Sequence, residues 1–376
     1  MKLLYTILGT YNSGGMERVL ANKANYLARH GYEITIVTTD QKNRKPYFKL
    51  DPSIRLIDLG INYTDDLGKG FISRGISFLK KNIEHKRKLK KLLFQIKPDI
   101  TVSMFDNDAS FIPDINDGSK KVLEIHFSRF KRIQYGRKGI WKLIDNYRSK
   151  ADLKTVKRFD RFVVLTEEDK GYWGELPNIQ VIQNANSFES DLKAKLENKQ
   201  VLAIGRFDYQ KGFDDLIEIW SKVYEKYPNW RLNIFGHGPL KEKYEYLIRS
   251  LKLQDVVSLH PPTSDIKSVY LEHSILAMTS RYEGLPMVLL EAQVCGLPMV
   301  SYTCKCGPKD IITSGENGYL IREGNNDEFA ERLIQLMEDA YFRKELGKAA
   351  ALNSVNYQEQ HIMAQWMTLF TDLIQK

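Results

Sequence analysis

Short apolar segments typical of β-strands alternate with helical segments along almost the whole chain, and this alternation constrains the fold most. Strands separated by helices favour an α/β architecture with mostly parallel sheets. The first half is predicted to contain strands at residues 2–8, 33–38, 54–59, 100–104, 122–126, 162–165 and 179–183. The second half is predicted to contain strands at residues 201–204, 231–235, 256–259, 275–279, 299–302 and 319–321.

The alternation is interrupted once, between residues 184 and 200, where the segment has the composition of a linker. A chain of 376 residues is long for one domain and suits two. We therefore predict a Rossmann-like domain over residues 1–190 and a second over residues 191–359. A last helix, over about residues 360–376, is rich in Met, Trp and Phe and is expected to dock on another part of the protein.

Charge is distributed unequally between the halves. Residues 1–190 carry 34 Lys and Arg against 22 Asp and Glu, a net of +12, whereas residues 191–376 carry 22 against 25, a net of −3. Such asymmetry indicates separate roles, and the basic half suits a membrane surface, a nucleic acid or an anionic substrate.

Two segments of the basic half mix cations with apolar and aromatic residues: 71–97, which predicts a basic amphipathic helix, and 127–158. These segments either lie on anionic lipid or form a solvated face. No recognised nucleic-acid-binding motif accompanies them, so nucleic acid is the weaker interpretation.

Hydropathy, the N-terminal residues and the cysteines indicate where in the cell the protein is expected. The chain has no run of about 18 apolar residues, so no membrane span is expected. The apolar start lacks a cleavage-site pattern and is interpreted as a strand, not a signal peptide. Three cysteines fit a reducing cytosol, and the lone Cys304 and Cys306 pair disfavours a metal site. We expect a cytoplasmic protein with peripheral contact to the inner face of the membrane.

The most specific local motif places Glu283 and Glu291 inside an apolar run. Residues 274–279 before it suggest a buried strand, and residues 286–295 a mostly buried helix, with Gly284 in the turn and Pro286 at the first helical position. A buried glutamate requires a partner, and a ligand hydroxyl could be the partner of Glu291. The two carboxylates could hold two ends of one extended ligand. A strand–turn–helix with an ion-paired glutamate also fits these residues.

Glycine turns and basic residues follow several predicted strands, at the sheet edge where such folds bind ligands. Gly14 and Gly15, and in the second half Gly236, would allow the backbone to approach a phosphate or a nucleotide. Arg206 and Lys211 follow a strand of the second half and together suit a diphosphate. Ordinary turns and two solvated cations are the alternative interpretations.

His126 ends the predicted strand 122–126. Its place at the ligand edge makes it a candidate site residue, although a structural histidine fits the same position.

Together these motifs resemble the retaining glycosyltransferases of family 4, which have the GT-B fold of two Rossmann-like domains facing a central cleft. The resemblance covers essentially the whole chain and rests on residues 13–19, 205–212, 236–239 and the spacing from Glu283 to Glu291. Residues 306–312 are similar to a subgroup that builds bacterial surface polysaccharides and lipid-linked glycans.

The resemblance implies transfer of a sugar, with UDP preferred on family grounds, to a lipid-linked or polysaccharide acceptor, without a metal or another cofactor. It implies that Arg206 and Lys211 bind the donor diphosphate and stabilise the leaving group. Glu291 would hold the ribose hydroxyls, and Glu283 would contact the donor sugar. His126 would lie beside that sugar.

Backbone contacts are also implied. The loop at Gly14 and Gly15 would approach the diphosphate, and the backbone of Gly284, Leu285, Pro286 and Met287 would support phosphate or sugar. The last helix, with Trp366 and Phe370, would cross back onto the first domain.

Two other functions stay open at this point: a related enzyme that epimerises a nucleotide sugar, and a basic module that binds lipid or nucleic acid without catalysis. The residues also leave open the sugar, the base, the acceptor and the number of subunits.

Overall fold

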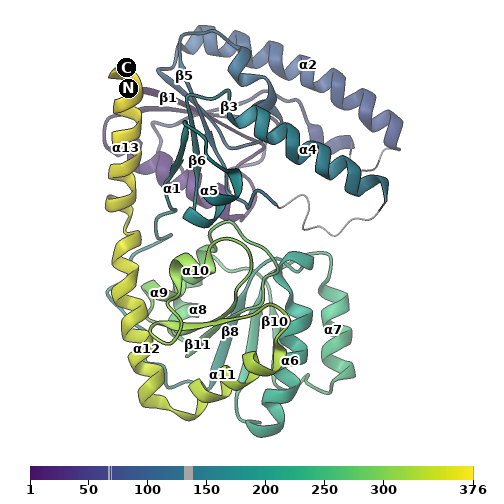
Figure 1. Cartoon of the computed structure of the whole chain (residues 1–376), viewed down its shortest axis with the longest axis vertical. Coiled ribbons are helices and arrows are strands. Elements are labelled where there is room, and N and C mark those ends of the chain that lie inside the picture. Colours follow the sequence, from purple (N-terminus) through teal and green to yellow (C-terminus); the bar gives the residue numbers. More distant parts are fainter. Residues whose placement is uncertain (67, 69, 131–138, 376) are drawn as a thin grey trace. The chain divides into compact units, whose positions relative to one another are not determined.

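The computed structural model describes the chain except for residues 67, 69, 131–138 and 376. The chain forms two compact α/β units (Figure 1). The first comprises Met1–Leu165, Lys170–Gln183 and Ile362–Lys376, and the second comprises Thr166–Asp169 and Asn184–His361. The chain therefore leaves the first unit, builds the second, and returns to the first in its last helix.

The first unit is built on a seven-stranded sheet with the order β3-β2-β1-β4-β5-β6-β7. Every pairing in it is parallel. The central strands are nearly continuous apolar runs because helices cover both faces of such a sheet. The strands are β1 (Lys2–Ile7), β2 (Glu33–Thr38), β3 (Arg55–Asp58), β4 (Ile100–Ser103), β5 (Lys120–Glu124), β6 (Arg161–Val164) and β7 (Ile179–Val181).

Helices from distant parts of the sequence cover the first sheet. They are α1 (Gly15–Arg29), α2 (Phe71–Ile96), α4 (Ile140–Val156), α5 (Glu167–Trp173) and the last helix α13 (Glu359–Gln375). Leu89 and Leu93 of α2 share an apolar cluster with Phe162 of β6. In α13, which is yellow in Figure 1, Trp366 is buried and its ring lies 3.7 Å from the Lys23 ammonium of α1.

The second unit has a six-stranded sheet with the order β10-β9-β8-β11-β12-β13, again with parallel pairings only. Its strands are β8 (Gln200–Ile204), β9 (Arg231–Phe235), β10 (Val257–His260), β11 (Ile275–Met278), β12 (Met299–Tyr302) and β13 (Gly318–Ile321). Its helices are α6 (Phe213–Lys226), α7 (Lys241–Ser250), α8 (Ile266–Leu271), α9 (Met287–Val294), α10 (Pro308–Ile311), α11 (Asn326–Glu338) and α12 (Ala340–Asn353).

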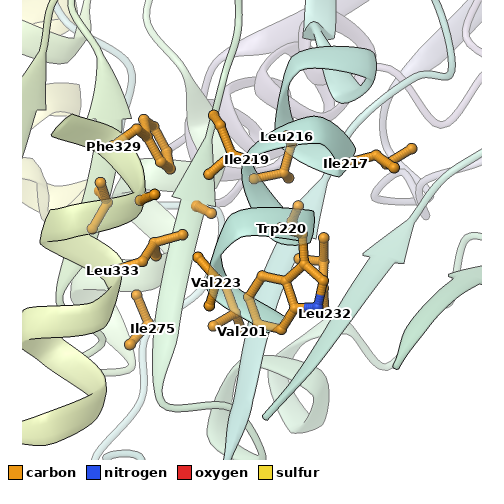
Figure 2. Close-up of a cluster of buried hydrophobic side chains, with 14 of the residues drawn as sticks. Val201, Leu216, Ile217, Ile219, Trp220, Val223, Leu232, Ile275, Phe329 and Leu333 are labelled. Carbon is orange, nitrogen blue, oxygen red and sulfur yellow. The ribbon is translucent and has the colours of Figure 1, made fainter. Parts of the chain in front are cut away.

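The core of the second unit lies between its sheet and helices α6 and α11 (Figure 2). Trp220 of α6 is fully buried there, beside Val201 of β8 and Leu232 of β9. Phe329 and Leu333, one turn apart on α11, are buried in the same cluster. The apolar faces of both helices therefore hold the sheet in place, and the loops that follow its strands carry candidate site residues.

All the predicted strands are present, with ends within two residues of the expected positions. The strand predicted at 122–126 is shifted: β5 ends at Glu124, so His126 lies beyond the strand and not at its end. The reason is tertiary, because Lys121 enters the sheet with its ammonium paired to Asp117 and its amide donating to Asp160. Pro286 is likewise not the first helical residue but the N-cap of α9.

Candidate active site

An ion pair between Lys211 and Glu283 joins the loop after β8 to the loop after β11. Lys211 Nζ lies 2.6 Å from Glu283 Oε1, and the two side chains are only 15% and 8% exposed. Gln210 supports the carboxylate, since its Nε2 donates to the Tyr282 carbonyl at 3.0 Å and to Glu283 Oε2 at 3.4 Å. Opposite charges in a mostly buried site attract more strongly than in water, so the Glu283 carboxylate is held in place.

Gly212 allows the Lys211 loop to reach this position. Its φ is +60°, and a Cβ at this residue would lie 2.3 Å from the Thr279 carbonyl oxygen. Thr279 Oγ1 in turn donates to the Gly212 carbonyl at 2.9 Å and to the Lys211 carbonyl at 3.2 Å. Only glycine fits both the left-handed backbone and the close approach, so the local sequence places Lys211 against β11.

Arg206 lies on the same loop but is accessible. Its side chain is 65% exposed, and its NH2 lies 3.1 Å from Asp208 Oδ2. The same nitrogen donates to Gln210 Oε1 at 3.3 Å. Gln210 thus links Arg206 to the Lys211–Glu283 pair, so that one loop carries a guanidinium and an ammonium. Binding of a diphosphate by these two cations stays a prediction. Sequence reasoning missed Gln210, because a single amide carries no pattern.

The glycine turn after β9 packs directly on this loop. A Cβ at Gly236 would lie 1.9 Å from the Gly205 carbonyl oxygen, and one at Gly205 would lie 2.9 Å from the Lys211 side chain. Glycine is therefore required at position 236 by a backbone contact inside the protein, whereas a side chain at position 205 would displace the flexible Lys211 side chain. Because both residues lack a side chain, the turn after β9 can pack against the loop that carries Lys211.

Glu291 has a partner that sequence reasoning did not find. Tyr270 of α8 is fully buried, and its Oη donates to Glu291 Oε2 at 2.8 Å. The same hydroxyl lies 3.3 Å from the Val288 carbonyl oxygen. Glu291 itself is 6% exposed. A buried carboxylate held by a phenol is oriented for a further donor, such as a ligand hydroxyl.

The start of α9 is shaped by the turn before α10. Gly307 has φ +96°, and a Cβ there would lie 2.3 Å from Pro286 Cδ and 2.9 Å from the Gly284 carbonyl oxygen. These close contacts restrict the backbone of the segment from Gly284 to Met287, in which Leu285 and Pro286 are buried. A helix N-terminus favours negative charge, and the backbone role of this segment toward a phosphate or a sugar stays a prediction.

In the first unit, the loop before α1 is covered by a carboxylate of the protein. Gly14 is the N-cap of α1 and Gly15 its first residue. A Cβ at Gly14 would lie 2.3 Å from Glu17 Oε2, and Asn12 Nδ2 donates to Glu17 Oε1 at 3.3 Å. The Glu17 carboxylate therefore lies where sequence analysis expects the backbone to receive a phosphate.

His126 contacts a buried acid in the same unit. Its Nε2 lies 3.0 Å from Glu124 Oε1, and the two side chains are 6% and 1% exposed. The Lys23 ammonium contacts both oxygens of the same carboxylate. Sequence reasoning treated Glu124 as part of a strand. The only local signal was an acid two residues before a candidate histidine.

Electrostatics define the charge state of this cluster. Burial alone would raise the pKa of Glu124, but the charges of Lys23 and His126 outweigh it and lower that pKa to about 2. Burial lowers the pKa of Lys23, and the Glu124 charge opposes this shift. The Glu124 carboxylate is therefore ionised at neutral pH.

The remaining predicted features fall partly outside the described residues. The basic segment 127–158 includes residues 131–138, which are not described, whereas 71–97 coincides with α2. Among the described residues, no group of three or more His, Cys, Asp and Glu side chains is arranged to hold a metal ion. None of the described helices is both long enough and apolar enough to cross a membrane.

Two family models together match residues 13–352 of the chain. "Glycosyltransferase Family 4" matches residues 13–185, and "Glycosyl transferases group 1" matches residues 185–352. An uncharacterized glycosyltransferase of Haemophilus influenzae is 30% identical over 370 residues, covering 97% of this chain and 98% of its own length. The amylovoran biosynthesis glycosyltransferase AmsD of Erwinia amylovora is 30% identical over 381 residues, with the same coverage of 97% and 98%.

A third relative is an α-1,4-N-acetyl-D-galactosaminyltransferase of Campylobacter jejuni, named for a PP-undecaprenol-linked glycan. It is 26% identical over 380 residues and covers 99% of each chain. Among solved structures, sucrose-phosphate synthase of Thermosynechococcus elongatus superposes with a TM-score of 0.82 at 16% identity, covering 99% of this chain and 98% of its own. The pneumococcal O-GlcNAc transferase GtfA, solved with UDP and GlcNAc, gives 0.80 at 12% identity, covering 100% and 99%.

These matches decide against a non-enzymatic module that only binds lipid or nucleic acid, because the named relatives of similar length are glycosyltransferases. The two parallel sheets and the structural superpositions identify the fold as GT-B. The chain therefore belongs to the group 1 and family 4 glycosyltransferases, and it is an enzyme of the hexosyltransferase type.

Proposed function

We propose that this protein is a retaining glycosyltransferase that moves a sugar from a UDP-sugar to a lipid-linked or polysaccharide acceptor during synthesis of a bacterial surface glycan, such as lipopolysaccharide or capsule. Relatives named for amylovoran biosynthesis and for a PP-undecaprenol-linked glycan support this class of acceptor. A structural neighbour that holds UDP supports the donor.

The observation that carries the proposal is the cationic loop of the second unit. Arg206 is accessible, and Lys211 is fixed 2.6 Å from Glu283 by a mostly buried ion pair. When the bond between the sugar and the diphosphate breaks, one further negative charge develops on the already anionic diphosphate, and positioned cations stabilise such a leaving group most effectively where water is excluded. Arg206 would close on the diphosphate as a fork and Lys211 as a point charge, so the reaction needs no metal ion.

The remaining site residues bind the donor at several points along its length. Glu291, oriented by Tyr270, accepts hydrogen bonds from the ribose hydroxyls, and Glu283 accepts them from the donor sugar. The backbone from Gly284 to Met287 supports the phosphate or the sugar. Departure of the diphosphate and attack of the acceptor on the same face retain the configuration of the sugar. His126 lies beside the sugar during this step, and catalysis comes mainly from positioning and charge stabilisation.

Substitution of the accessible cation tests the proposal. Because Arg206 is 65% exposed, R206A costs little stability, and we expect its transfer rate to fall about 10²- to 10³-fold. K222A is the matched control, since Lys222 pairs with Asp327 on the surface of the same unit. A panel of UDP-, GDP- and ADP-sugars identifies the donor.

Full transfer by R206A, K211A and E291A from every donor used would contradict the proposal. Incubation with donor alone separates the remaining alternative, because an epimerase converts the donor when no acceptor is present. Accumulation of a new nucleotide sugar under these conditions would favour that alternative.

We also propose that α2 rests on the anionic cytoplasmic face of a membrane. Five of the described large apolar side chains of α2 are exposed, and four of them lie on one side of the helix, exposed to 54, 64, 72 and 47% of their surface: Ile76, Leu79, Ile83 and Phe94. At 3.6 residues per turn, they share an arc of about 140° with Lys80, Lys86, Arg87, Lys90 and Lys91. Leu89 and Leu93, next to this arc on the helix, are buried. Exposed apolar groups among cations fit a membrane interface.

Sedimentation with vesicles tests this location. Because each well-placed cation contributes about 1 kcal/mol, K90E/K91E should weaken binding to phosphatidylcholine vesicles containing phosphatidylglycerol by at least about 30-fold. K344E/K348E, on helix α12 of the second unit, is the control for net charge. Equal binding by both variants, or no preference for the anionic vesicles, would refute the proposed surface.

A further inference from the structure

The loop that carries Lys211 is held along its backbone by residues that follow β11. The Tyr209 carbonyl accepts a hydrogen bond from Arg281 NH1 at 2.8 Å, and the Gln210 carbonyl accepts one from the Arg281 amide at 2.8 Å. The carbonyls of the next two residues accept from the Thr279 hydroxyl. Two residues after β11 therefore fix four successive carbonyls of this loop.

The guanidinium of Arg281 is itself held by two carboxylates in the first turn of α6. Its NH2 lies 2.9 Å from Asp215 Oδ1 and 3.1 Å from Asp214 Oδ1. Its Cζ lies 4.5 Å from the centre of the Tyr209 ring, where a cation is attracted to the aromatic face. The side chain is only 13% exposed, and ion pairs shielded from water are stronger than those on an open surface. One side chain thus joins β11, the Lys211 loop and helix α6.

The contacts of Arg281 lie within the protein, unlike those expected of a ligand residue. Its NH1 donates to a backbone carbonyl and its NH2 to two carboxylates, which balance the guanidinium charge. Arg206, in contrast, is 65% exposed near the start of the same loop. The two arginines therefore differ in kind, because Arg206 is accessible to a diphosphate, whereas Arg281 holds the loop in place.

Lys211 needs such support because lysine carries its charge at the end of a flexible four-carbon chain. Ordering a flexible side chain or loop on binding weakens affinity, and a loop that is already fixed avoids this loss. The Lys211 ammonium is held at its far end by Glu283, at 2.6 Å. Because Arg281 lies two residues before Glu283 and also holds the Lys211 loop, it connects both partners of the ion pair.

We propose that Arg281 is a positioning residue for Lys211: it fixes the backbone that carries this lysine, so that the ammonium meets the donor diphosphate without reordering of the loop. The inference rests on the proposed role of Lys211 at the diphosphate. It gives the ion pairs of Arg281 with Asp214 and Asp215 a function in donor binding, beyond their contribution to stability.

A double-mutant cycle tests the inference, because it measures whether two residues act through each other. R281K keeps the positive charge and replaces the planar fork of donors by a point charge. R281M/D215N removes the guanidinium at unchanged net charge, and Asp214 keeps its ion pair with Lys243 at 3.1 Å. Each variant is made in the wild-type and in the K211A background.

K243M is the matched control, since it breaks an ion pair of the same Asp214 carboxylate from helix α7 and leaves Arg281 in place. Isothermal titration calorimetry measures the Kd for whichever of UDP, GDP and ADP binds the wild-type protein most tightly. Thermal unfolding defines a temperature at which each variant is folded, and binding is measured at that temperature.

We expect R281K and R281M/D215N to raise this Kd about 10-fold in the wild-type background and less than about 2-fold in the K211A background. K243M should leave the Kd within about 2-fold of its reference value in both backgrounds. A loss of affinity that disappears with Lys211 is the signature of an effect through this lysine, and a general loss of stability does not produce it.

Equal fold-changes in the two backgrounds, or wild-type affinity in both Arg281 variants, would overturn the inference. It is also overturned if K243M weakens binding as much as R281K does, or if neither Arg281 variant folds. These outcomes leave the proposed function intact when K211A itself binds weakly.

Failure of the proposed function gives a different result. A K211A protein that binds the nucleotide as tightly as the wild type contradicts the proposed role of Lys211, on which the inference rests. Absence of binding by all three nucleotides contradicts the function itself, and the inference falls with it.

Discussion

Replacement of Tyr270 by Phe tests whether Glu291 is a ligand residue or only a buried structural acid. The substitution deletes one hydroxyl from a fully buried side chain, and this hydroxyl donates to Glu291 Oε2 at 2.8 Å. Hydrogen bonds to charged groups contribute about 1.5–3 kcal/mol, so we expect the free energy of unfolding to fall by about that amount.

Nucleotide binding should change as well. Without Tyr270 the Glu291 carboxylate loses one of the contacts that order it before UDP arrives, and ordering one such side chain on binding costs about 0.5–1.5 kcal/mol. The Kd for UDP should therefore rise about 2- to 10-fold. Urea unfolding gives the stability, and isothermal titration calorimetry gives the affinity.

Y302F is the control. Tyr302 is also fully buried, and its hydroxyl donates to a side-chain acceptor, the Oδ1 of Asn326, in the same unit. We expect it to lose about 1 kcal/mol of stability with an unchanged Kd for UDP. If Y270F loses stability but binds UDP as tightly as the wild type, the reasoning is refuted, and Glu291 is a structural residue.

Three further predictions concern the second unit. W220A removes a fully buried side chain from the core in Figure 2 and should lower the free energy of unfolding by about 3–5 kcal/mol, measured by urea unfolding. G212A places a methyl group 2.3 Å from the Thr279 carbonyl at a φ of +60°, so it should cost more than about 1 kcal/mol and weaken UDP binding by displacing Lys211; unchanged binding would contradict this placement. D310N tests a pH effect: burial and the Glu168 charge raise the pKa of Asp310 to about 6, so the folded state is penalised increasingly as pH rises from about 4 to about 6, and fully above that. After allowance for solvent screening, D310N should stabilise the protein by about 1–2 kcal/mol at pH 7 and by nothing below about pH 4, where the carboxyl is protonated in both states; an equal gain at both pH values would contradict the assignment.

Local sequence patterns were sufficient for the fold class. The strands are apolar runs bounded by turn residues, and helices such as α1 and α6 have a 3.6-residue apolar period, so both can be recognised without knowledge of their neighbours. Strands β2, β9 and β12, each one position in from the edge of its sheet, begin and end where the pattern predicts. The prediction was less accurate for β5, which includes the charged residue Lys121. The Lys121 ammonium pairs with Asp117 and its amide donates to Asp160, and neither contact can be recognised from a pattern of apolar residues.

Pairing of side chains across the fold could not be predicted in the same way. Glu291 and Tyr270 lie 21 positions apart, and Lys23 and Glu124 lie 101 apart. No periodicity links such residues, since they meet only after helices have packed on the sheets. The contact of Gly307 with Pro286 is of the same kind, because it depends on how closely two turns approach.

The sequence by itself determined two α/β units, the edge of the second sheet that carries Arg206 and Lys211, and the motif from Glu283 to Glu291, because these depend on residue type and spacing over short distances. Only the tertiary structure decided which charges meet. It paired Lys211 with Glu283, placed Tyr270 on Glu291, and buried Glu124 between Lys23 and His126. The strength of an electrostatic contact depends on distance and on exclusion of water, and both are set by packing of the whole unit.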